Sequence, residues 1–458
     1  MENSRKPRPA DLVSHVASRL GESLFPGAHV VLGLSGGIDS ICLLHILVEL
    51  ASSRRFSMRA VHVNHGISSK ADQWALFCKS VCLRLGIAFA QENVDVASYR
   101  HLGPEAAART VRWSALLSHE SDFLVLAQHR DDQAETLLLQ LMRGAGPAGL
   151  AGMAANAFQF NSRSSQSRGS ARVLRPMLDV SRTEIEEFVR SRGLEWVEDD
   201  SNSNVALDRN FVRHRVVPVL AERYPHVATM ISRSAGLLAE ASELLLQLGG
   251  QDIALIENDD ALDLPGLRDL GEARARNALR AYCQLRGIPV PGFSFLREIW
   301  TQLREPRQDS NICIEWNGVV LRRYRNRIFI EKNRATDSRL FQSESWNGEP
   351  CLPLTALNGL LNFKPEEGRG LSVTKLRMAP VTVRLRRGGE RLRVDAQRPY
   401  RTLKNLWQEK GTPPWRRMSQ PLLFCGEHLV CVPGLGEAFE WRAAPGERGL
   451  IVSWQTFT

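Results

Sequence analysis

Two serines, two glycines and an aspartate form the first group of residues here that could do chemistry. The turn Ser35-Gly36-Gly37-Ile38-Asp39-Ser40 follows a short apolar run and precedes an amphipathic one. Glycines let the backbone approach a phosphate closely, and the N-terminus of a following helix attracts anions. Asp39 offers oxygen ligands suited to Mg²⁺. The pattern predicts a nucleotide phosphate site, although such a turn can also be a plain strand–helix connection.

Acidic residues form a second candidate group. His129, Asp131, Asp132 and Glu135 lie within seven consecutive positions. Because Asp132 and Glu135 are three residues apart on a predicted helix, their carboxylates can face the same cation. His129 and Asp131 precede that helix and could contact ATP or a metal ion. The alternative is that Asp131 and Asp132 only cap the helix.

Histidines and arginines complete the candidate set. His62 and His65 end a predicted strand, and they could equally be satisfied strand-end residues. Arg109 and Arg112 are three apart and share one face of a predicted helix. No cysteine or second histidine lies at a zinc-ligand spacing from His129, so the sequence does not predict a zinc site.

The elements that must position these residues alternate between strand and helix. We predict strands over 30–34, 58–63, 87–94 and 123–127, and helices over 40–50, 71–85, 104–118 and 132–142. This alternation predicts an α/β domain with a Rossmann-like parallel sheet, covered by helices on both faces. Ligands bind such sheets beyond the carboxyl ends of the strands, where the candidate residues lie.

The rest of the chain has a different character. We expect a Ser/Arg-rich surface loop over 161–171, which could also touch RNA, and helices over 181–192, 225–248 and 267–303. A hairpin is predicted over 313–330, with Asn317-Gly318 at its turn. The expected domains are a catalytic one over 1–220, a mainly helical middle one over 221–335, a linker over 336–375 and a small α+β one over 376–458.

Composition limits the possible functions. The chain has 458 residues and a net charge of +9, and residues 370–458 carry 15 Lys and Arg against 7 Asp and Glu. A basic excess on one domain favours a polyanionic partner. The sequence has no apolar stretch long enough to span a membrane and no secretory signal, so we expect a cytoplasmic protein without membrane contact. The eight scattered cysteines are expected to be reduced core residues.

The turn at 35–40 resembles the pyrophosphatase loop of the N-type ATP pyrophosphatase (PP-loop) superfamily. Further segments resemble the tRNA(Ile)-lysidine synthase family in family order: 61–66, 105–113, 129–136, 143–153, 175–178, 199–202 and 209–213, then 385–391, 403–406, 413–417 and 433–436. The match is nearly continuous over 30–220. Gln128 and Ser68 depart from it, because the family often has histidine at the first position and a basic residue at the second.

The resemblance implies a two-step reaction. Family members use ATP to adenylate C2 of the wobble cytidine of isoleucine tRNA with a CAU anticodon. L-lysine then displaces AMP and forms lysidine. By resemblance, Asp39 handles Mg²⁺ and pyrophosphate, and Asp132 and Glu135 hold lysine. The residues implied in ATP binding are Ser35, Gly36, Gly37, Ile38, Asp39, Ser40, His62, His65 and His129.

Arginines are expected to contact the nucleic acid. Arg112 is implied as a catalytic contact to the adenylated base or phosphate, with Arg109 as a second choice that also touches tRNA. The basic C-terminal domain is expected to bind tRNA, since arginine binds phosphates and stacks on bases, and the resemblance implies that it reads the acceptor stem. Its predicted contacts are Arg386, Arg387, Arg391, Lys404 and Arg417. The nearby Trp407 and Trp415 could stack on bases or belong to the core.

Two alternatives remain open. A sulfur-inserting tRNA thiolase of the same superfamily would commonly use paired cysteines, whereas Cys78 and Cys82 have the four-residue spacing of a helix core face. A noncatalytic RNA-binding protein with the same fold would not need Asp39, Asp132 and Glu135.

Overall fold

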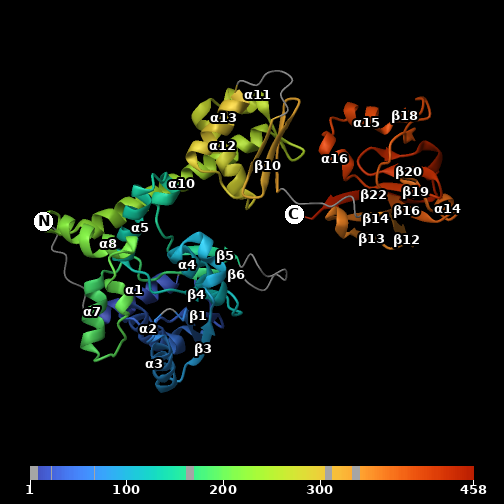
Figure 1. Cartoon of the computed structure of the whole chain (residues 1–458). Helices are drawn as coiled ribbons and strands as arrows, with labels where there is room; N and C mark the ends of the chain where they lie inside the picture. Colours follow the sequence, from blue (N-terminus) through green and yellow to red (C-terminus); the bar gives the residue numbers. More distant parts are fainter. Residues whose placement is uncertain are drawn as a thin grey trace. The chain divides into compact units, whose positions relative to one another are not determined.

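The computed structural model describes residues 9–21, 23–66, 68–160, 170–304, 312–332 and 341–457. The chain divides into two compact units, Met1–Leu248 and Gly249–Thr458, whose elements are labelled in Figure 1. Most of the loop predicted over 161–171 lies outside the described residues; 170 and 171 begin a strand. In the described part of the chain, no helix is both long and apolar enough to cross a membrane.

The first unit is built on a six-stranded sheet in the order β3-β2-β1-β4-β6-β5. Its strands are β1 (His29–Gly33), β2 (Ser57–Asn64), β3 (Ala88–Asn93), β4 (Phe123–Val125), β5 (Asn156–Phe160) and β6 (Ser170–Leu174). Neighbouring strands are parallel except for the edge pair β5 and β6. The predicted Rossmann-like sheet is confirmed, and two strands flanking the Ser/Arg-rich segment extend it.

Helices connect these strands. They are α1 (Pro9–Gly21), α2 (Ile38–Arg54), α3 (Ala71–Arg84), η1 (Ala97–Leu102), α4 (Pro104–Leu116), α5 (Arg130–Met142), α6 (Pro147–Leu150) and α7 (Arg182–Ser191). The predicted helices are confirmed, while α1 was not predicted.

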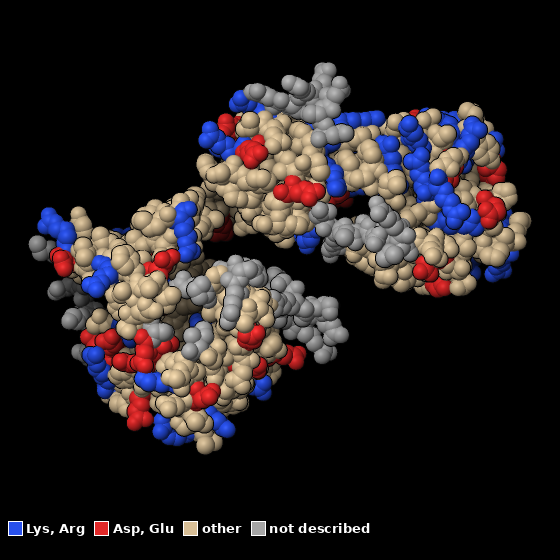
Figure 2. Space-filling model, in the orientation of Figure 1, with Lys and Arg blue, Asp and Glu red and all other residues tan. Residues whose placement is uncertain are grey.

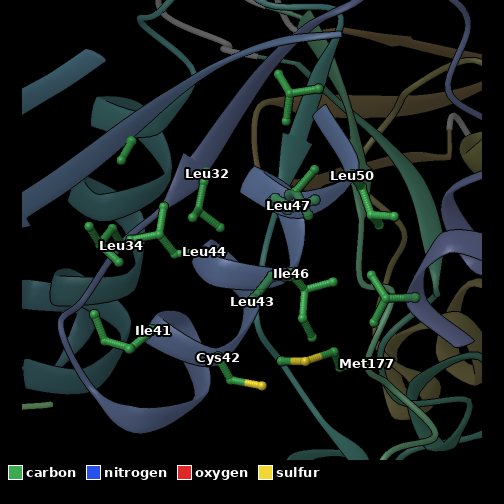
Figure 3. Packing of buried hydrophobic residues seen from close by; sticks show 14 of the residues in the cluster. Leu32, Leu34, Ile41, Cys42, Leu43, Leu44, Ile46, Leu47, Leu50 and Met177 are labelled. Atoms are coloured by element: carbon green, nitrogen blue, oxygen red, sulfur yellow. The ribbon is translucent and has the colours of Figure 1, made fainter. Parts of the chain in front are cut away.

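Helix α2 carries the core of this unit. Leu43, Leu44 and Ile46 are fully buried, and Figure 3 shows the α2 side chains packed with Leu32 and Leu34 of the preceding strand and loop. Truncating such a side chain costs about 2–5 kcal/mol. The turn between β1 and α2 is therefore anchored at both ends.

A helical run ends the first unit, and its last helix continues past Leu248. It consists of η2 (Asp200–Ser203), α8 (Asp208–Phe211), the π-helical turn η3 (Val212–Val216), α9 (Val217–Arg223) and the long α10 (Val227–Ile256). A π turn widens the helix locally and is frequent at functional sites. This turn contains Arg213 and directly follows α8, which contains Arg209.

The second unit begins with helices and a five-stranded sheet in the order β7-β8-β11-β10-β9. The elements are β7 (Glu257–Asn258), β8 (Ala261–Asp263), α11 (Leu264–Asp269), α12 (Glu272–Leu285), α13 (Phe293–Arg304), β9 (Cys313–Trp316), β10 (Val319–Tyr324) and β11 (Arg327–Lys332). The predicted hairpin is confirmed, since Asn317 and Gly318 both have positive φ between β9 and β10. The region contains more strand than the expected mainly helical domain.

The remaining strands form two more sheets and a short pair. The elements are β12 (Glu344–Trp346), β13 (Cys351–Leu354), η4 (Thr355–Leu357), β14 (Gly359–Glu367), β15 (Leu371–Ser372), α14 (Val373–Leu376), β16 (Val381–Arg384), β17 (Arg391–Leu392), β18 (Arg401–Thr402), α15 (Leu403–Glu409), α16 (Pro414–Met418), β19 (Leu422–Cys425), β20 (His428–Val432), β21 (Gly436–Glu437), η5 (Phe439–Trp441) and β22 (Arg448–Thr456). The sheet orders are β12-β16-β19-β20-β21 and β13-β14-β22-β15, and β17 pairs with β18.

We expected a linker over 336–375, but residues 341–375, the described part of that segment, are instead largely folded into these sheets. All nine residues of β14 pair with β22, near the end of the chain. Leu361 and Phe363 of β14 alternate inward and are buried. The C-terminal sheets therefore begin before residue 376, because β22 has no partner for its full length without β14.

Candidate active site

The turn between β1 and α2 is held by its own side chains. Ser40 Oγ accepts the Gly36 N–H at 3.1 Å and donates to the Gly37 carbonyl at 2.9 Å. Gly36 has φ +89°, and a Cβ there would lie 2.8 Å from the Val197 side chain. Ser35 Oγ accepts the Gly37 N–H at 3.3 Å, and Ile38 is buried. Backbone N–H groups at the start of α2 are thus presented on a preformed turn, as a phosphate site requires.

Asp39 lies between an arginine and a histidine. Both of its carboxylate oxygens accept from Arg182 Nη1 at 2.7 Å, and His129 Nε2 lies 3.6 Å from Oδ1. Burial raises the pKa of Asp39, and the charges of His129 and Arg182 oppose that rise. Sequence reasoning did not single out Arg182, which is distant in the chain.

His129 and its neighbour Asp131 contact the starts of three helices, α2, α5 and α7. Its Nδ1 accepts the Asp131 N–H at 3.3 Å, and Asp132 Oδ2 accepts the His129 N–H at 3.1 Å, a reciprocal cap on α5. Asp131 Oδ2 accepts the Arg182 N–H at 3.0 Å, at the start of α7. Burial alone would lower the pKa of His129, but the three surrounding aspartates raise it. The capping interpretation therefore holds for Asp132, which completes the cap made by His129 and lies near Asp39, whereas the Asp131 carboxylate accepts an N–H at the start of α7 instead.

Asp132 and Glu135 do face one cation group, as their spacing predicted, but that group is a pair of arginines. Arg209 donates to Asp132 Oδ1 at 2.9 Å and to Glu135 Oε2 at 2.8 Å. Arg213 Nε donates to Glu135 Oε1 at 2.6 Å. Burial would raise the pKa of Asp132, but His129 and the arginines hold it below its ordinary value. The four-residue spacing of Arg209 and Arg213 places them on one helix face, so the sequence did offer a signal that this pair could bind the acidic pair.

The two histidines after β2 differ in their surroundings. His62 is buried, and its Nδ1 lies 2.9 Å from the Leu34 carbonyl, which matches the strand-end interpretation. His65 Nε2 accepts from Arg112 Nε at 3.4 Å. Burial lowers the pKa of His65 to about 4, and Arg112 adds to this effect. A neutral His65 can accept this bond, so it orients Arg112.

Arginines gather around Trp113 on α4. The Cζ atoms of Arg109 and Arg175 lie 5.9 and 6.0 Å from its ring centroid. Arg175 donates to Gln128 Oε1 at 2.5 Å, so the residue that departs from the family pattern is an acceptor here. Burial lowers the pKa of Arg112, and the charges of Arg109 and Arg209 lower it further. Such mutually repelling arginines suit an anionic or aromatic ligand.

Two carboxylates could hold a cation. Among the residues that the structure covers, no group of three or more His, Cys, Asp or Glu could hold a metal by itself. Mg²⁺ is usually bound by one or two carboxylates together with substrate phosphates. Asp39 and Asp132 lie 3.6 and 3.5 Å from the same atom, His129 Nε2. This pair, beside the phosphate turn, fits that mode of binding.

The predicted tRNA contacts of the C-terminal region fall into two groups. Arg387, Arg391 and Lys404 are exposed. Figure 2 shows many basic side chains on the surface of this part of the chain. Arg386 lies over the ring of Trp407, which is a core residue. Arg417 is buried and donates to the Thr412 carbonyl and, at 3.0 Å, to Tyr324 Oη. Because its donors are used inside the fold, Arg417 is a structural residue rather than a surface contact.

Trp415 and the two helix cysteines are also packing residues. Trp415 makes edge contacts with Tyr324 and Phe329. Cys78 and Cys82 are buried, and burial raises their pKa values to about 12 and about 11. Both are therefore protonated thiols at neutral pH.

Comparisons with known proteins cover nearly the whole chain. A PP-loop domain matches residues 12–220, a TilS substrate binding domain matches 262–329, and a TilS substrate C-terminal domain matches 381–454. The tRNA(Ile)-lysidine synthase of Nitrosomonas europaea is 36% identical over 99% of this chain and 98% of its own. That of Methylococcus capsulatus is 38% identical over 94% and 97%.

A solved structure is similar in part. The U34-tRNA thiolase NcsA from Methanococcus maripaludis is 18% identical with a TM-score of 0.43, covering 50% of this chain and 79% of that chain. The full-length matches, at more than a third identity, lead to a firmer assignment. With its PP-loop domain and both TilS domains, this chain belongs to the tRNA(Ile)-lysidine synthase family.

Proposed function

We propose that this enzyme ligates L-lysine to C2 of the wobble cytidine of isoleucine tRNA with a CAU anticodon, using ATP and forming lysidine. The main observation behind the proposal is that a carboxylate of the phosphate turn and one from α5 lie close to the same histidine. Asp39 at the turn and Asp132 on α5 both lie within 3.6 Å of His129 Nε2. Full-length similarity to tRNA(Ile)-lysidine synthases supports the choice of substrate.

The first step activates the base. The oxygen on C2 of cytidine attacks the α-phosphorus of ATP, the bond from that phosphorus to the oxygen bridging to the β-phosphate breaks, and pyrophosphate leaves. The N–H groups of residues 38–40, in the first turn of α2, and the guanidinium of Arg112 stabilise charge on the phosphate oxygens. Mg²⁺, held by Asp39 and Asp132, would supply further charge neutralisation when bound.

The second step joins lysine to the base. The neutral ε-amine of lysine attacks C2, the bond from C2 to the oxygen of AMP breaks, and the amine loses a proton. Asp132 and Glu135 hold the lysine substrate in this proposal. Since Arg209 and Arg213 already occupy these carboxylates, lysine must share them or displace one guanidinium.

Other residues serve the nucleic acid. Arg109 contacts the anticodon region, and Arg386, Arg387, Arg391 and Lys404 contact the acceptor stem. In this division, residues 1–220 form the catalytic domain, 221–335 the middle domain and the basic C-terminal region a grip on tRNA. The two-ended grip would separate this tRNA from the methionine tRNA with the same anticodon.

The alternatives fit the structure less well. A cysteine-dependent thiolase would need accessible thiolates, whereas Cys78 and Cys82 are buried thiols. A noncatalytic RNA-binding protein would have no use for carboxylates gathered at a phosphate turn.

The proposal is tested by incubating the protein with isoleucine tRNA, ATP and labelled lysine, followed by mass spectrometry of the nucleosides. We expect labelled lysidine and release of pyrophosphate. Asp39→Ala should abolish pyrophosphate release, whereas Glu187→Ala, at an exposed position on α7, should not. Full activity of Asp39→Ala, or no consumption of ATP by the unaltered protein, would refute the proposal.

A further inference from the structure

Arg182 is an unassigned cation at the phosphate site. Its Nη1 donates to both oxygens of Asp39 at 2.7 Å, and its Nε donates to Glu186 Oε1 at 3.1 Å. Its backbone N–H is fixed by Asp131 at 3.0 Å. The side chain is 41% exposed. The guanidinium is therefore anchored at Nε, while its Nη1 lies against Asp39 at the turn.

The arrangement creates a conflict that nucleotide binding must resolve. Both oxygens of Asp39 face one guanidinium nitrogen, so the carboxylate is committed to Arg182. A cation bound with ATP would place a second positive charge beside Arg182, so the guanidinium and the cation would compete for the same carboxylate. Arginine stays charged under all ordinary conditions, so it needs a new anion if Asp39 turns away. Phosphate oxygens are its best available partners, because charge-assisted bonds to them are short and strong.

We propose that Arg182 is a phosphate-binding catalytic residue, which holds Asp39 in the empty enzyme and donates to the β- and γ-phosphates when ATP binds. This assignment rests on the proposed function. Asp39 is released for the cation, and Arg182 stabilises the charge that pyrophosphate gains as its bond to the α-phosphorus breaks. Glu186 keeps the guanidinium near the turn throughout. One side chain thus prepares the carboxylate and then stabilises the leaving group.

The competing view is a permanent ion pair that only ties α7 to α2. The two views differ in what they predict for ligands. A permanent pair would contribute to stability and leave pyrophosphate binding unchanged. If Arg182 binds phosphate, its loss must weaken the binding of ATP and pyrophosphate, which carry the β- and γ-phosphates or their equivalent. The affinity for AMP, which lacks them, should stay unchanged.

Calorimetric titration of the full chain separates these views without measuring catalysis. The ligands are ATP, pyrophosphate and AMP, each with Mg²⁺. Arg182→Ala should weaken binding of ATP and pyrophosphate by about tenfold or more, the effect of losing a hydrogen bond to a charged group, and change AMP binding less than about twofold. Arg190→Ala is the matched control, because Arg190 also pairs with Glu186, at 3.1 Å, on the same helix. It should bind all three ligands as the unaltered protein does.

The outcomes separate this assignment from the proposed function. If the unaltered protein binds ATP and Arg182→Ala binds pyrophosphate equally well, the assignment alone is overturned. An equal loss of AMP affinity would also overturn it, since that indicates general damage to the site. If Arg182→Ala does not fold, Arg182→Gln decides by the same criteria, because glutamine can still donate to Asp39. Failure of the unaltered protein to bind ATP would overturn the proposed function and this assignment with it.

Discussion

Replacing Glu135 by glutamine is the sharpest test of the acidic pair. The Glu135 side chain is only 3% exposed and accepts from Arg209 Nε at 2.8 Å and from Arg213 Nε at 2.6 Å. Glutamine has nearly the same size, so the change removes charge without opening a cavity. Its amide can accept from one arginine but cannot neutralise two.

The structure sets the expected size of the effect. Removing one partner of a fully buried ion pair costs about 3–5 kcal/mol. Arg209 and Arg213 are partly exposed and keep Asp132 as a partner, so we expect a loss of about 1–3 kcal/mol in unfolding free energy. If Glu135 also holds the lysine substrate, losing that bond to a charged carboxylate costs about 1.5–3 kcal/mol, or roughly 10- to 150-fold in lysine affinity.

The two steps can be assayed separately. Release of pyrophosphate without lysine reports adenylation, and transfer of labelled lysine reports the second step. We expect Glu135→Gln to raise the lysine concentration for half-maximal transfer and to leave adenylation nearly intact. Glu187→Gln controls for the loss of a charge at an exposed site. Equal loss of both steps would refute a lysine-specific role. Asp132→Asn should impair lysine transfer more than adenylation, but by a smaller margin than Glu135→Gln, since Asp132 also accepts the His129 N–H.

The other predictions concern the basic C-terminal surface, the buried cysteines and Asp179, a carboxylate bonded to α1. Lys404→Ala should weaken tRNA binding and reduce its log–log salt slope by about 0.9, whereas Arg417→Ala should lower the midpoint of urea unfolding, because Arg417 is bonded inside the fold. Iodoacetamide should leave Cys78 unmodified in the native protein, since burial raises its pKa to about 12; rapid native alkylation detected by mass spectrometry would contradict this. Burial alone would raise the pKa of Asp179, but His15 and Arg19 hold it well below its usual range. The ion pairs of Asp179 therefore stabilise the fold above about pH 4, and this stabilisation is lost as the pH falls further. Urea unfolding at about pH 6 and about pH 3 measures how much stability is lost on acidification, and we expect a smaller loss for Asp179→Asn than for the unaltered protein.

The elements of the first unit could be predicted well because their signals are local. Apolar periodicity identified β1, β2 and α2, and the glycines marked the turn between them. Strand β14 was missed and its segment was assigned to a linker. It pairs with β22, whose partner residues lie about 80 to 100 positions further along the chain, and no local pattern reports such a pairing. The weak strands β5 and β6 were missed because a Ser/Arg-rich segment separates them.

The candidate site divides in the same way. The sequence by itself determined which groups could do the chemistry: a glycine turn with Asp39, and two carboxylates spaced to share a cation. Only the tertiary structure decided which cations meet them. Arg182 reaches Asp39 across 143 positions, and Arg209 reaches Glu135 across 74. Helix geometry is set by neighbouring residues, so spacing predicts a shared face. Ion pairs between helices depend on how the sheet and its connections bring distant segments together, and that is a property of the whole fold.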